Sequence, residues 1–90
     1  MSERRNQLEI IFDILRAIQE KGGVIRPTHL LYKSNLSHAR MKEYIVHLSE
    51  KGMITQIEHK GKQHFTITEQ GSKFLVDYKK VRELTEAFGL

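Results

Sequence analysis

The sequence contains no cysteine, only one proline and no long apolar run. The absence of cysteine excludes disulfide bonds, thiolate metal sites and cysteine nucleophiles, so packing and hydrogen bonds must stabilise the fold. No stretch is apolar for long enough to cross a bilayer, and the N-terminus lacks the apolar core of a secretory signal. Ninety residues suffice for one small domain, which we expect in the cytoplasm and not in a membrane.

Motifs for catalysis are missing as well. The sequence has no glycine-rich phosphate loop, no nucleophile motif and no paired carboxylates in an apolar setting. Five histidines are present, but they are not spaced to supply the three or four convergent ligands of a tetrahedral zinc site. We therefore expect no catalytic residues, no metal and no cofactor, and no small-molecule effector is evident.

Acidic residues are absent between Lys21 and Lys42. The chain has a net charge of +4, and residues 21–68 hold eight lysine and arginine residues against three glutamates, so the remainder is close to neutral. An acid-free basic surface is expected where a protein approaches phosphates. The alternative is a solvated, lysine-rich surface without a partner.

Apolar residues at helical spacing predict a first helix over residues 4–21. Its apolar arc spans about 220°, which is wider than the stripe that one core usually requires. We expect the positions that widen the arc to contact the partner subunit of a dimer, namely Ile10, Ile14 and Ala17.

Residues 24–26 predict a short strand, and the lone Pro27 then opens a second helix that ends at Ser34. Asn35 tolerates left-handed backbone, so it suits a tight turn. In the short second helix Tyr32 can contact a phosphate, although a half-buried tyrosine is the more common outcome.

The clearest signals surround a third helix over residues 37–51. Ser37 can cap its first turn, and Gly52 is free to adopt the left-handed conformation after its last residue. At about 100° per residue, one stripe of the helix is apolar. That stripe contains Met41, Tyr44, Ile45 and Leu48. The opposite face remains free to bind a partner.

Residues 53–59 and 63–67 are rich in β-branched and aromatic side chains and predict a hairpin with residues 60–62 at its tip. We expect Ile57 to lie opposite Phe65, and Thr55 opposite Ile67, because this register gives one apolar face. In this register His59 and His64, the only near pair of histidines, point to opposite faces.

Thr68 can cap a last helix that extends to about residue 88, although Gly71 lies near its start. Five residues recur at alternating spacings of four and three, which is typical of a coiled-coil seam, and all of them except Thr85 are large and apolar. The seam residues are Phe74, Tyr78, Val81 and Phe88, and we expect them to contact a second copy. The alternative is a helix that packs against the first helix of the same chain.

The order helix, strand, helix, turn, helix and hairpin resembles that of winged helix-turn-helix proteins. Residues 36–37, 48–54 and 65–71 look like the corresponding segments of prokaryotic winged-helix regulators. Residues 25–40 resemble, more narrowly, an archaeal family of small chromatin-associated DNA-binding proteins. The resemblance implies double-stranded DNA as ligand and a homodimer held by an antiparallel coiled coil of C-terminal helices.

We therefore expect a mostly α fold with a small β-wing. Residues 1–68 would form the winged helix-turn-helix domain and residues 69–90 a long C-terminal dimerisation helix. The candidate DNA-binding residues are Arg26, Lys33, Ser37, His38, Arg40, Lys42, His47, Lys60 and Lys62. Such a protein would be a transcriptional regulator or a nucleoid-associated chromatin protein. The alternative is a winged-helix module that binds another protein, which would not require the acid-free stretch.

Overall fold

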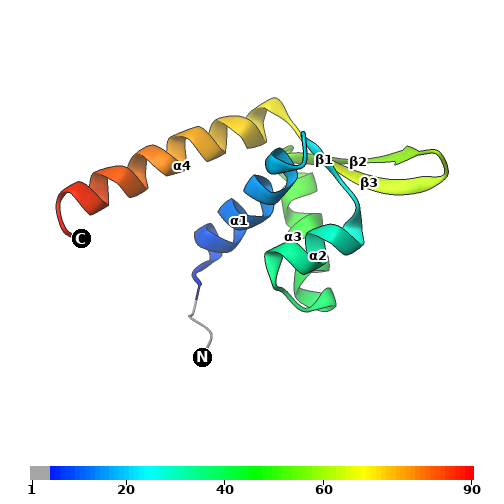
Figure 1. Cartoon of the computed structure of the whole chain (residues 1–90), viewed down its shortest axis with the longest axis horizontal. Helices are drawn as coiled ribbons and strands as arrows, with labels where there is room; N and C mark the ends of the chain where they lie inside the picture. The colour runs from blue at the N-terminus through cyan, green and yellow to red at the C-terminus, as the bar shows by residue number, and fades with distance from the viewer. Residues whose placement is uncertain (1–4) are drawn as a thin grey trace.

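The computed structural model describes residues 5–90, which form four helices and a three-stranded antiparallel sheet. The elements in chain order are α1 (Gln7–Glu20), β1 (Val24–Ile25), α2 (Pro27–Ser34), α3 (His38–Glu50), β2 (Ile54–His59), β3 (Lys62–Ile67) and α4 (Glu69–Ala87). The strand order is β1-β3-β2. Figure 1 shows the β2–β3 hairpin and α4 extending toward opposite ends of the molecule. Across residues 5–90, no helix has both the length and the apolar character needed to span a membrane.

Helix α1 begins at Gln7 rather than at Arg4, which lies outside the described residues. Asn6 explains this start, because its side chain accepts a hydrogen bond from the Glu9 backbone N–H at 2.8 Å. The Glu9 carboxylate in turn accepts a bond from the Asn6 backbone N–H at 2.9 Å. This reciprocal capping box satisfies two N–H groups that would otherwise lack partners in the first turn.

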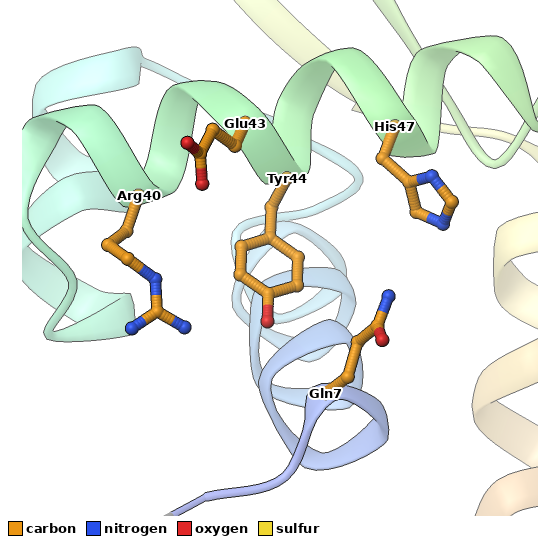
Figure 2. Close-up of a pocket in the computed structure, with 5 residues that line it drawn as sticks. All are labelled: Gln7, Arg40, Glu43, Tyr44 and His47. Atoms are coloured by element: carbon orange, nitrogen blue, oxygen red, sulfur yellow. The ribbon is translucent and has the colours of Figure 1, made fainter.

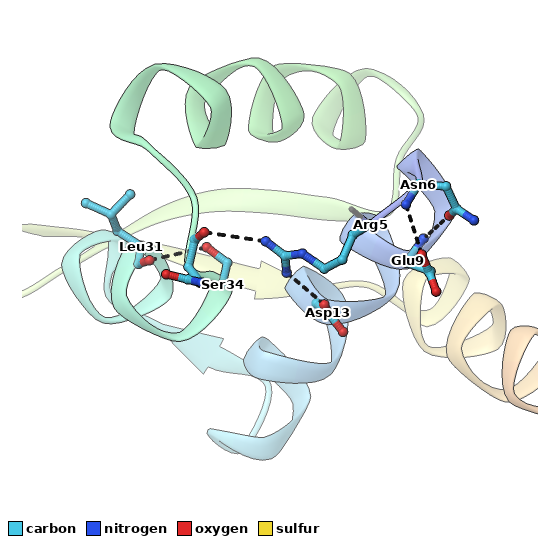
Figure 3. A network of polar contacts seen from close by, with 7 residues as sticks. Arg5, Asn6, Glu9, Asp13, Leu31 and Ser34 are labelled. Carbon is cyan, nitrogen blue, oxygen red and sulfur yellow. Dashed lines mark hydrogen bonds and ion pairs between the residues drawn. The ribbon is translucent and has the colours of Figure 1, made fainter. Parts of the chain in front are cut away.

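Arg5 connects the start of α1 to the turn between α2 and α3 (Figure 3). Its guanidinium donates to the Asp13 carboxylate at 2.8 Å and to the Asn35 carbonyl at 3.4 Å. Asn35 has a φ of 56°, the left-handed conformation expected for it, and it ends α2. The tight turn between the two helices is thus also linked to α1.

The wide apolar arc of α1 is covered within the same chain. Ile10, Ile14 and Ala17 are all buried, and the exposed fraction of Ile14 is 0%. The reason is that α1 packs most extensively against α2, α4, β1 and β3 of its own chain. The prediction that these three residues contact the partner subunit is therefore wrong, and the arc reflects the central position of α1.

The predicted register of the hairpin is wrong by one residue. Ile57 lies opposite His64, and Phe65 lies opposite Gln56. The cause is the turn, because Lys60 and Gly61 have φ values of 52° and 73° and form a two-residue connection. A two-residue loop with positive φ at both positions suits the right-handed twist of paired strands. The predicted register would instead leave residues 60–62 unpaired.

The observed register places Phe65 on the buried face of the sheet and Ile57 on the exposed face. Thr55 lies opposite Thr66, not opposite Ile67. Ile67 lies opposite the buried Ile54 instead. The apolar face is therefore built at the base of the hairpin, where β1 pairs with β3, and the outer part of the hairpin is free of the core.

The same shift brings His59 and His64 to one face of the hairpin, so the prediction that they point apart is also wrong. Their ring centroids are 5.9 Å apart in an edge-to-face arrangement. Nδ1 of His64 lies 3.0 Å from the Lys62 carbonyl oxygen. Within residues 5–90, no three histidine or carboxylate side chains converge as metal ligands.

Helix α4 packs its apolar side chains on the core through its first half, and beyond that half Arg82 lies over the Phe12 ring at 5.4 Å. The Tyr78 ring lies 5.2 Å from the Phe12 ring of α1 and 5.6 Å from the Phe74 ring, measured between centroids. Phe74 and Tyr78 thus contact the core of their own chain, as the alternative interpretation of this helix expects. Beyond them Val81 and Phe88 are 55% and 73% exposed, so the predicted seam is free only from Val81 onward.

Gly71 allows α4 to pass close to the backbone that leaves α3. A Cβ atom at this position would clash with the Met53 carbonyl oxygen and would lie 2.9 Å from Cγ1 of Ile67. We expect Gly71→Ala to lower the free energy of unfolding by about 1–3 kcal/mol, because backbone must move to accept the methyl group. Urea denaturation followed by circular dichroism measures this change.

The control for this prediction is Ser72→Ala at the next position of α4. This variant removes a hydroxyl without adding volume and should change the unfolding free energy by about 0.5 kcal/mol or less. Equal stability of Gly71→Ala and the unmodified protein would show that α4 does not need this close approach.

Candidate nucleic-acid interface

Helix α3 has the boundaries that the sequence predicts. The Ser37 hydroxyl accepts a hydrogen bond from the Arg40 backbone N–H at 3.2 Å, and Gly52 follows the helix with a φ of 74°. The inward stripe is buried and consists of Met41, Ile45 and Leu48. Because this stripe fixes the rotation of the helix, His38, Arg40 and Lys42 are left exposed in its first turns.

Helix α2 contributes Arg26 and Lys33, both exposed. Arg26 is the N-cap residue of α2, and within residues 5–90 its guanidinium forms no ion pair. Tyr32 is 85% exposed, not half-buried. It lies two positions from each of the buried residues Leu30 and Ser34, which places it on the opposite side of the helix. This spacing could have identified Tyr32 from the sequence.

The hairpin tip presents Lys60 and Lys62, which are both exposed. Lys60 belongs to the two-residue turn, whereas Lys62 pairs with His59 at the end of the ladder. Figure 1 shows this tip at one end of the molecule, far from the C-terminus of α4.

Within residues 5–90, the exposed cations of α2, α3 and the hairpin tip form no ion pairs with carboxylates. We use the term basic surface for the exposed residues Arg26, Lys33, Arg40, Lys42, Lys60 and Lys62. The ion pairs among residues 5–90 join Arg5 to Asp13, Arg16 to Glu20 and Lys73 to Asp77, and none includes a residue of the basic surface. Unpaired cations on α2, α3 and the hairpin tip suit contacts with a polyanion.

Arg40 and His47 both line a shallow hollow of about 230 Å³ on one flank of α3, and Tyr44 lies between them (Figure 2). Cζ of Arg40 lies 5.9 Å from the centroid of the Tyr44 ring, which is within the range of a cation–π contact. Gln7, at the start of α1, and Glu43 complete the lining. No local pattern in the sequence indicates that Gln7 lies beside α3, so sequence reasoning misses it as a site residue.

The charged pair with a perturbed pKa lies elsewhere, on α4. Nζ of Lys73 donates a hydrogen bond to the Asp77 carboxylate at 2.8 Å. This bond raises the pKa of Lys73 and lowers the pKa of Asp77. Both side chains are exposed and lie one helical turn apart, so the pair is a surface feature of α4 and not part of the basic surface.

The architecture and this surface can now be compared with known proteins. A family model described as winged helix-turn-helix matches residues 4–86. The chain belongs to the winged helix-turn-helix family. In this winged helix-turn-helix protein the β2–β3 hairpin is the wing, and α2 and α3 form the helix-turn-helix. The resemblance inferred from the sequence is thereby confirmed.

One relative of this winged helix-turn-helix protein is the uncharacterised protein MJ0287 of Methanocaldococcus jannaschii. The two are 37% identical over 83 residues, which cover 92% of this chain and 76% of MJ0287. Among solved structures, Sso10a-2, a DNA-binding protein from Sulfolobus solfataricus, has a TM-score of 0.80 and 21% identity over 93% of this chain and 85% of its own. SSV1 F-93 has a TM-score of 0.69 and 22% identity over 98% and 99% of the two chains. At these identities the structural likeness establishes the fold.

Proposed function

We propose that this winged helix-turn-helix protein binds double-stranded DNA, with α3 in the major groove and the wing along the phosphate backbone. The observation that supports this proposal most is the basic surface, which is exposed and unpaired on the three elements that flank such a duplex. Sso10a-2, which shares the fold, is described as a DNA-binding protein. The protein would act in the cytoplasm on the nucleoid, as a transcriptional regulator or a chromatin protein.

The major groove is about 12 Å wide and admits an α-helix, whose first turns then approach the base edges. In this protein the first turns carry Ser37, His38, Arg40 and Lys42, and His47 follows on the flank. The Ser37 hydroxyl caps the helix through its oxygen but keeps a hydrogen to donate. Arg26, Lys33, Lys60 and Lys62 lie on the neighbouring elements, where they suit phosphate contacts that set register.

The proposal includes a homodimer joined by the free half of α4. Val81, Leu84 and Phe88 are all exposed there, and Figure 1 shows this half of α4 projecting beyond the rest of the chain. Large apolar side chains that are exposed along one face of a helix are stabilised when a second copy of the helix covers them. Two copies would present two α3 helices to one duplex.

Removing the wing lysines tests the proposed DNA contact. We expect the double variant Lys60→Ala, Lys62→Ala to weaken binding to all duplexes alike. The plot of log affinity against log salt concentration should become flatter by about 0.9 for each phosphate that the variant no longer neutralises. Gel-shift titrations of one duplex at several salt concentrations give this slope.

A matched control removes the same charge from another place. Lys79→Ala with Lys80→Ala takes two exposed lysines from α4, outside the basic surface. This control should leave the slope unchanged, because neither lysine lies on α2, α3 or the wing. An equal change in both double variants would mean that the wing has no specific place in the interface.

A further inference from the structure

The outward face of α3 is not basic at its centre. The buried stripe of Met41, Ile45 and Leu48 fixes the rotation of the helix. At 100° per residue, the direction opposite that stripe holds Ala39, Glu43, Val46 and Glu50, all of which are exposed. Lys42 lies on one flank of this face. Arg40 lies on the other flank, where its guanidinium is over the Tyr44 ring.

Glu43 is the informative residue on this face. It is exposed, and none of the cations in residues 5–90 lies within ion-pair distance of its carboxylate. A surface that only neutralises phosphates gains nothing from a carboxylate at its centre, because the carboxylate repels the polyanion. The carboxylate of Glu43 therefore lowers the affinity of α3 for DNA of any sequence.

A carboxylate is repelled by the phosphates of the DNA backbone, but in the major groove it can form a hydrogen bond with a base. It accepts a hydrogen bond from the N4 amino group of cytosine. Adenine also presents an amino group at this edge, but its neighbouring N7 acceptor repels a side chain that can only accept. The neighbouring Ala39 and Val46 present small apolar groups, which suit the C5-methyl group of thymine. The centre of α3 thus carries groups that distinguish bases.

We propose that α3 reads base sequence and that Glu43 selects cytosine, with Ala39 and Val46 against thymine methyl groups. This inference rests on the proposed DNA binding and adds to it the recognition of a particular base sequence. Lys42 and Arg40 on the flanks hold the helix in the groove, and the carboxylate penalises sites that lack a cytosine amino group. The protein then occupies particular sites and does not coat DNA uniformly.

Selection from a random duplex library tests this assignment with three proteins. The unmodified protein should enrich a motif that contains one invariant cytosine. Glu43→Gln should change that position from cytosine to adenine, because a glutamine amide pairs with N6 and N7 of adenine. Glu50→Gln, the matched control on the same face but in the last turn of α3, should keep the cytosine.

Titrations of defined duplexes at one salt concentration give the size of the effect. Replacing the selected C·G pair by T·A should weaken binding of the unmodified protein roughly 5- to 100-fold. Glu43→Gln should lose this preference, whereas Glu50→Gln should retain it. Both variants should bind random duplexes somewhat more tightly than the unmodified protein, because each removes one negative charge. Thermal unfolding verifies that both variants fold. We expect both to fold because Glu43 and Glu50 are exposed.

Two outcomes would overturn the inference while leaving DNA binding in place. The unmodified protein could bind every duplex equally and enrich no motif, or Glu43→Gln could retain the preference for cytosine. A third outcome, in which the unmodified protein binds no duplex even at low salt, would reject the proposed function itself.

Discussion

Replacing Ile14 by alanine is expected to lower the free energy of unfolding by about 2–5 kcal/mol. Ile14 is fully buried in the middle of α1, the helix that the other elements surround. Its truncation removes buried methyl and methylene groups and leaves a cavity that close-packed neighbours fill only in part. Urea denaturation followed by circular dichroism, at two protein concentrations, measures the change.

Leu8→Ala is the matched control, because Leu8 lies on the same helix but is 51% exposed. Its truncation should change stability by about 0.5 kcal/mol or less. Measuring both variants at two protein concentrations separates the stability of the single chain from any effect of self-association. An unchanged unfolding free energy of Ile14→Ala would contradict the central place of Ile14 in the core of the single chain.

The elements that the sequence predicts well are those specified by local chemistry. Ser37 caps α3, Gly52 follows it with positive φ, and Asn35 takes the left-handed conformation between α2 and α3. Each of these depends on the conformational preference of one residue and its neighbours within a few positions. The family resemblance adds the order of elements, and the fold follows from both.

The errors concern contacts between distant segments. The apolar arc of α1 is evident in the sequence, but no local rule indicates whether the chain or a partner covers it. The register of the wing depends on whether Lys62 belongs to the turn, and the positive φ of Lys60 decides this. A lysine is not a residue from which left-handed backbone is ordinarily predicted, so a three-residue tip is the natural assumption.

The candidate site is predicted unevenly for a related reason. Basic residues are recognisable from charge alone, so the sequence identifies the basic surface. The predicted stripe already implies that Glu43 lies on the free face of α3, but in the sequence it counts only as an opposing charge, because its exposure and its lack of an ion pair within residues 5–90 become evident only in the structure. Gln7 lies far from α3 in sequence, and only the structure places it beside Tyr44.

Val81→Glu is expected to convert the proposed dimer to a monomer. Val81 is exposed in the single chain, so the substitution should cost the monomer little stability. In a dimer joined by the free half of α4, the same position would be buried between two apolar helices. Each large apolar side chain buried there contributes about 1.5–3 kcal/mol, and an unpaired carboxylate in such a seam opposes burial. Light scattering should give the mass of two chains for the unmodified protein and of one chain for the variant.

The loss of the dimer should also weaken DNA binding, although α4, which carries Val81, extends away from the wing (Figure 1). Two linked α3 helices bind one duplex with an avidity that exceeds single-site affinity by roughly 10²–10⁴-fold, and the monomer loses this gain. Lys79→Glu, on the polar side of the same helix, changes charge more strongly but should leave both the mass and the affinity close to those of the unmodified protein. A monomeric mass for the unmodified protein at micromolar concentration would remove the dimer from the proposal. The exposed apolar side chains of α4 would then stay exposed in the form that binds DNA.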